Sequence, residues 1–85
     1  MQISGYFESS ADSTTQREPR QLAEVTLVAN AAELRLIASF LIQCAQGIEM
    51  RGMKWEHEHL SDRHPQFESS PHFVVFNDAK LERQR

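Results

Sequence analysis

One long amphipathic stretch, residues 31–51, constrains the fold of this chain more than any other feature. Apolar residues recur along it at spacings of three and four, which predicts one wide stripe on an α-helix. The stripe consists of Leu34, Ile37, Leu41, Cys44 and Ile48, joined by Ala38, Phe40 and Ala45. Asn30 is a suitable N-cap, and Arg51 followed by Gly52 is typical of a helix end. At 1.5 Å per residue the helix would be roughly 30 Å long, enough to cross a small sheet.

Four segments with strand-like patterns flank this helix. They are residues 3–7 and 22–28 before it, and 53–60 and 73–76 after it. The order β-β-α-β-β predicts an α+β fold, with a four-stranded antiparallel or mixed sheet and the helix packed on one face. The other face of that sheet would be open, with room for a second copy or a bound partner.

The length of 85 residues indicates a single domain. We expect its core to lie within residues 3–77. A polar stretch rich in serine and threonine, residues 8–21, predicts a long loop, and residues 78–85 form a charged C-terminal tail.

Charge and hydropathy argue against two classes of partner. Twelve acidic and nine basic residues leave a net charge of −3, and the basic residues are scattered along the chain. Domains that bind nucleic acid normally carry the opposite balance or one dense basic face, so we expect no nucleic-acid partner. The most apolar stretch, residues 34–48, is interrupted by charged and polar side chains and is too short to span a membrane.

The cysteine content and the first residues indicate a compartment. Cys44 is the single cysteine and cannot form an internal disulfide. Residues 1–5 turn polar at once and lack the pattern of a signal peptide. We therefore expect a cytoplasmic protein with a reduced thiol.

The histidines raise the possibility of a metal site. All four fall within sixteen residues, at His57, His59, His64 and His72. A His-x-His pair on a strand places both imidazoles on one face, an arrangement that some metal sites use. The segment fails the His-Glu-x-x-His pattern of zinc proteases, because Ser61 stands at the second histidine position. We assign no metal and no cofactor, and keep histidine-based metal binding as an alternative function.

No assembled catalytic signature is present, so the chain is not predicted to be an enzyme. Glu56, Glu58 and Asp62 form an acidic group without a marked apolar pocket, which favours a solvated face or a surface for a basic partner. Cys44 lies inside the helical stripe, as an inert buried thiol would. The chain contains no glycine-rich phosphate loop and no Gly-x-Ser-x-Gly elbow.

Trp55 has two interpretations. Alternation over residues 53–60 places it on the same strand face as His57 and His59. It is either a core anchor or, on the open face, an interface anchor of the kind that carries binding energy.

Four segments carry a resemblance to a known family. They are Ile3-x-Gly5-Tyr6, Glu24-Val25-Thr26-Leu27-Val28-Ala29 followed by Ala32-Glu33-Leu34, Trp55-Glu56-His57-Glu58-His59-Leu60-Ser61-Asp62, and Phe73-Val74-Val75-Phe76-Asn77. With these segments, which span about residues 3 to 77, the chain resembles the immunity protein 32 family of bacterial polymorphic toxin systems. The polar loop 8–21 departs from that pattern.

The resemblance implies a small, non-catalytic cytoplasmic protein that binds and neutralises a cognate toxin domain. The candidate partner-binding residues are Trp55, Glu56, His57, Glu58, His59, Ser61 and Asp62. Besides metal binding, a homodimeric structural or adaptor domain is the other alternative.

Overall fold

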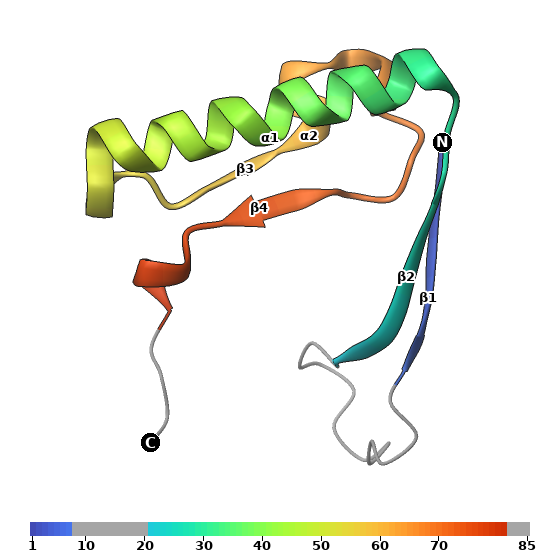
Figure 1. Ribbon diagram of the computed structural model, residues 1–85, viewed down its shortest axis with the longest axis horizontal. Helices are drawn as coiled ribbons and strands as arrows, with labels where there is room; N and C mark the ends of the chain where they lie inside the picture. The colour runs from blue at the N-terminus through green and yellow to red at the C-terminus, as the bar shows by residue number, and fades with distance from the viewer. Residues whose placement is uncertain (8–20, 82–85) are drawn as a thin grey trace.

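The computed structural model describes residues 1–7 and 21–81 (Figure 1). Most of the predicted polar loop and the last four residues of the predicted tail therefore lie outside the described residues. The described elements are β1 (Gln2–Phe7), β2 (Leu22–Val28), α1 (Ala31–Arg51), β3 (His57–His59), α2 (Leu60–Arg63) and β4 (Val74–Phe76), with short 3₁₀ turns η1 (Gly52–Lys54), η2 (Pro65–Phe67) and η3 (Asp78–Lys80).

The bounds predicted for the long helix are confirmed, because both of its ends carry strong local signals. At the start, the Asn30 side chain accepts a hydrogen bond from the Glu33 N–H at 2.8 Å, and the Glu33 carboxylate accepts one from the Asn30 N–H at 2.9 Å. This reciprocal capping box satisfies two backbone donors that the first turn would otherwise leave open. At the end, Gly52 has a φ of 55°, a left-handed conformation that glycine adopts without steric cost, and its N–H bonds to the Ile48 carbonyl.

The core lies under the middle of α1. Its buried side chains are Ile37, Phe40 and Cys44 from α1, with Trp55, Leu60 and Phe67 from the segment that follows. Only part of the predicted apolar stripe is buried, because Leu34 and Leu41 remain nearly half exposed. The surface that α1 covers is therefore narrower than the stripe itself.

The single four-stranded sheet predicted from the sequence is wrong. The fold is α+β, but its strands form two separate antiparallel pairs, β1–β2 and β3–β4. The β3–β4 pair packs beneath α1, whereas β1–β2 leaves the N-terminal end of the helix and projects away from it (Figure 1). Only Ala29 and Asn30 connect β2 to α1, and at this short link the chain turns away from the sheet beneath the helix. We call the projecting β1–β2 pair the arm.

The strand predicted over residues 53–60 is also shorter than expected. Its first residues form the 3₁₀ turn η1, and β3 begins only at His57. Leu60 opens α2, while its N–H still bonds to the Phe73 carbonyl at 2.8 Å. The segment expected to be a loop, residues 61–72, thus contains most of α2 and all of η2.

Candidate partner-binding surface

The side of the β3–β4 pair that faces away from α1 carries a row of rings. In the antiparallel register His57 lies opposite Phe76 and His59 lies opposite Val74, so these four side chains share one face. The His57 ring stacks on Phe76 with a centroid distance of 5.9 Å and an interplanar angle of 6°. His72 extends the row, with its ring 5.6 Å from that of His59. We call these five residues the histidine face.

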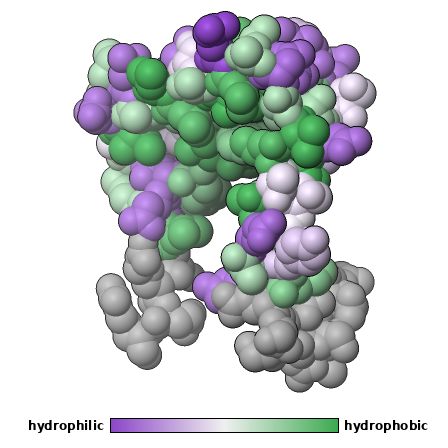
Figure 2. All heavy atoms as spheres, turned by 45° about the vertical axis from the view of Figure 1, so that its right-hand side comes forward, coloured by the Kyte–Doolittle hydropathy of each residue, from purple (hydrophilic) through white to green (hydrophobic). Residues whose placement is uncertain are grey.

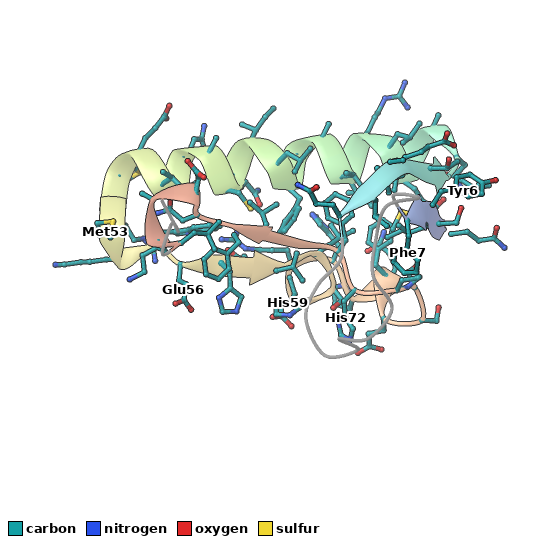
Figure 3. The ribbon with its side chains drawn as sticks, turned by 90° about the horizontal axis from the view of Figure 1, so that it is seen from below. Tyr6, Phe7, Met53, Glu56, His59 and His72 are labelled. Carbon is teal, nitrogen blue, oxygen red and sulfur yellow. The ribbon has the colours of Figure 1, made fainter. Side chains whose placement is uncertain are left out.

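Two exposed carboxylates flank the histidine face. Glu56 Oε1 lies 3.0 Å from His57 Nδ1, and Asp62 Oδ2 lies 3.9 Å from His59 Nδ1. Figure 3 shows Glu56, His59 and His72 on the same side of the molecule, pointing away from α1. These two carboxylates place negative charge at the edge of the histidine face.

Glu58 belongs to the other side of the strand. Its carboxylate pairs with the Arg63 guanidinium, which reaches it through Nε and through Nη2, the latter at 3.3 Å. Arg63 also donates to the Gln43 side chain of α1 at 3.2 Å, so the pair ties α2 to the helix. The hydrogen bond and charge of Glu58 raise the pKa of Arg63 above its ordinary value. Glu58 therefore lies on the side of β3 opposite the histidine face, whereas Glu56 lies at the rim of that face.

Trp55 lies in the core, not on the histidine face. Only 5% of its surface is exposed. An added Cβ at Gly47 would come within 2.5 Å of the indole Nε1, so the ring packs directly on this helical glycine. The alternation predicted from the sequence breaks between Trp55 and His57, because regular pairing begins only at His57. Trp55 is therefore removed from the candidate contact residues, and Ser61, half-buried in α2, lies at their margin.

The histidines of the face interact with each other and do not surround a common centre. The His57 and His59 rings meet edge to face with a centroid distance of 5.4 Å. Within residues 1–7 and 21–81, no group of three or more His, Cys, Asp or Glu side chains is arranged to hold a metal ion. Cys44 is a core residue, and burial, assisted by the charge of Glu58, raises the pKa of its thiol.

Comparison with protein families decides the assignment. The model of the family described as Immunity protein 32 matches residues 24–79. The chain belongs to the immunity protein 32 family. No curated protein and no solved structure matches the chain.

The immunity protein 32 match runs from β2 to η3 and so includes the whole histidine face with its flanking carboxylates. It does not include β1, so the Ile3-x-Gly5-Tyr6 part of the sequence resemblance lies outside the matched residues. In the part of this family member that the structure describes, no helix is both long and apolar enough to cross a membrane.

Sequence reasoning missed four residues of this region in the immunity protein 32 member. Val74 and Phe76 could have been found, since alternation along residues 73–76 places them on one face. His72 precedes β4, and nothing in the sequence pattern places its ring beside His59. Asn77 is a buried polar residue, 3% exposed, whose amide donates to the Trp55 carbonyl at 2.8 Å and to the Gly52 carbonyl at 3.2 Å.

Proposed function

We propose that this chain binds and neutralises a cognate bacterial toxin domain, and that it acts by binding rather than by catalysis. Its membership of the immunity protein 32 family, with the histidine face inside the matched residues, is the observation that carries the proposal. The raised pKa of Cys44 and its buried position give the thiol no nucleophilic role. We infer that the protein acts in the cytoplasm, where this thiol stays reduced.

The proposed contact surface is the histidine face with Glu56, Asp62 and the margin at Ser61. Its centre is apolar and aromatic, because Phe76 is half exposed beneath the stacked His57 ring. An exposed aromatic pair inside a polar rim is the usual composition of an interface anchor. The anionic rim would attract a basic surface on the toxin and speed the encounter.

The test requires the toxin domain encoded beside the gene of this protein. Co-expression with it should restore growth of the host, and the purified pair should bind with an association rate that falls as salt rises. Replacing the rim charges, Glu56→Gln with Asp62→Asn, should lower the association rate at low salt about tenfold and flatten its salt dependence.

The control makes the same charge change elsewhere. Glu49→Gln with Glu68→Gln removes two exposed carboxylates, one on α1 and one beside η2. This control should leave association and growth rescue unchanged. Equal affinity and equal rescue for the rim variant and the unmodified protein would refute this contact surface. Absence of rescue by the unmodified protein would refute neutralisation of that toxin.

A further inference from the structure

The arm carries an apolar face that its own chain leaves largely uncovered. Opposite residues of an antiparallel pair share a face, so Ile3 with Leu27 and Gly5 with Val25 lie on one side, and Leu22 follows at the outer end. Ile3 and Leu27, near the helix, are half-buried, whereas Val25 further out is 59% exposed. Figure 3 shows Tyr6 and Phe7 on opposite sides of β1. Figure 2 shows the arm separated by a hollow from the rest of the molecule, with apolar residues gathered above that hollow.

Each described strand is an edge strand, because each described sheet has two strands. Proteins usually protect such edges with charged residues or proline. β2 contains Glu24 and β3 contains Glu58, but β1 (QISGYF) and β4 (VVF) contain neither a charge nor a proline. The two unprotected edges therefore belong to strands in different sheets of the same chain.

The free edge of β4 has hydrogen-bonding groups ready for another strand. The Leu60 N–H bonds to the Phe73 carbonyl, and the Asn77 N–H bonds to the Glu56 carbonyl. Backbone groups alternate in direction along a strand. Those of Phe73 and Asn77 point to β3, so those of Val74 and Phe76 point outward.

The flank of α1 that lies toward the free edge of β4 carries exposed apolar side chains. Gln43 bonds to Arg63 of α2 on one flank of the buried row of α1. At 3.6 residues per turn, Leu34 and Leu41 lie on the other flank, where both are exposed. In Figure 1, α2 is partly hidden behind α1, whereas β4 lies below the helix and clear of it. An added strand at the edge of β4 would thus lie under Leu34 and Leu41.

We propose that two copies of this chain exchange their arms. β1 of one copy pairs with the free edge of β4 of the other, which completes a four-stranded sheet in the order β3-β4-β1-β2 across the two chains. The apolar face of the arm then packs under Leu34 and Leu41 of the second copy. Donor and acceptor are present in every copy, so a two-fold axis satisfies both at once and closes the assembly.

Both surfaces that such an exchange would bring together carry exposed apolar side chains. Val25 of the arm is 59% exposed, and Leu34 and Leu41 of α1 are 47% and 44% exposed. Burial of these side chains against one another would stabilise the dimer.

The experiment measures the mass of the isolated protein by light scattering over a dilution series from roughly 1 to 100 μM, the range that spans typical weak dimers. We expect about twice the chain mass of 9.8 kDa at the upper end. Val25→Glu should raise the dimer dissociation constant at least about tenfold, because it brings a charge into the new core. Val28→Glu is the matched control: the same change on the same strand at 55% exposure, but on the opposite face, and it should leave the dimer intact.

A second variant tests the strand pairing itself. Val74→Pro removes an N–H that points away from β3. The β3–β4 pair therefore keeps its own hydrogen bonds, while the free edge of β4 loses a donor. It should weaken the dimer without changing the far-ultraviolet circular dichroism of the monomer. A monomer at every concentration, or equal effects of Val25→Glu and Val28→Glu, would overturn the proposal. A monomer that Val25→Glu destabilises would show instead that the arm folds onto its own chain. None of these measurements uses a toxin, so failure here leaves the proposed function standing, and failure of growth rescue leaves the dimer standing.

Discussion

Asn77→Ala should destabilise the protein more than any other single loss of a polar side chain that we describe. The Asn77 amide nitrogen donates to two carbonyls, those of Trp55 and Gly52, and its Oδ1 accepts from the Ala79 N–H at 3.0 Å. These bonds hold the end of β4 against the turn that follows α1, and thereby hold Trp55 in the core. A buried residue with three partners leaves those partners unsatisfied when it is truncated.

The magnitude follows from the three bonds. A hydrogen bond contributes about 0.5–1.5 kcal/mol net, so their loss should lower the free energy of unfolding by about 3 kcal/mol. A domain of 85 residues has a total stability of about 4–13 kcal/mol, so the loss is a large fraction of it. At about 4–8 °C per kcal/mol, the melting temperature should fall by about 12–24 °C.

The assay is urea unfolding followed by the fluorescence of Trp55, the single tryptophan of the chain. Asn77→Asp keeps the acceptor for the Ala79 N–H but replaces the amide donor by an anion beside two carbonyls. It should destabilise at neutral pH at least as strongly and recover partly below about pH 4, where a protonated carboxyl can donate. Gln46→Ala, exposed on α1, should change stability by less than about 0.5 kcal/mol. A loss below about 1 kcal/mol for Asn77→Ala would refute the role of these bonds.

Three further outcomes are expected. Gly47→Ala should lower stability by about 1 kcal/mol in the same urea assay, because overpacking against the Trp55 ring, at about 1–3 kcal/mol, outweighs the gain in helix propensity; a more stable variant would refute that packing. The hydrogen bond from the Asn30 N–H, assisted by the N-terminal ammonium, lowers the pKa of Glu33. The Glu33 carboxylate should therefore stabilise the fold at pH values above its pKa in the unfolded chain, about 4.3. This stabilisation should be lost as the pH falls through the lower pKa that Glu33 has in the folded protein. Glu33→Gln should reduce this acid dependence in unfolding curves measured at several pH values. The Cys44 thiol should react with a thiol reagent much more slowly in the folded protein than in urea, since burial raises its pKa; equal rates would contradict its core position.

The helix could be predicted from the sequence to the residue, because its signals are local. Asn30 and Glu33 meet within one turn, and Gly52 ends the helix by its own backbone preference. The apolar periodicity located Ile37 and Phe40 in the core for the same reason.

The sheet could not be predicted in the same way, because pairing joins residues distant in sequence. Alternation indicates a strand but does not show which strand pairs with it. The same local pattern therefore fits one four-stranded sheet and the two separate pairs that the structure shows. Trp55 shows a second limit. The side of the sheet on which Trp55 lies depends on where regular strand pairing begins. The hydrogen bond to its carbonyl comes from Asn77, which lies 22 residues further along the chain. The sequence places all the candidate contact residues within residues 55–62, whereas the structure puts Glu56 and Glu58 on different sides and adds Phe76 from another strand.

The two proposals couple arm exchange to toxin binding through the outer side of the arm. When the apolar face of the arm turns to α1 of the second copy, its other face continues the histidine face of that copy. This other face carries Tyr6, which pairs with Glu24 in the arm and is strongly exposed. Each toxin-binding surface of the dimer would then contain residues of both chains. Tyr6→Ala should accordingly weaken toxin binding and leave the dimer mass unchanged in light scattering. Val25→Glu should lower both the toxin affinity and the mass measured by light scattering. A Tyr6→Ala variant with unaltered toxin affinity would show that the histidine face acts alone.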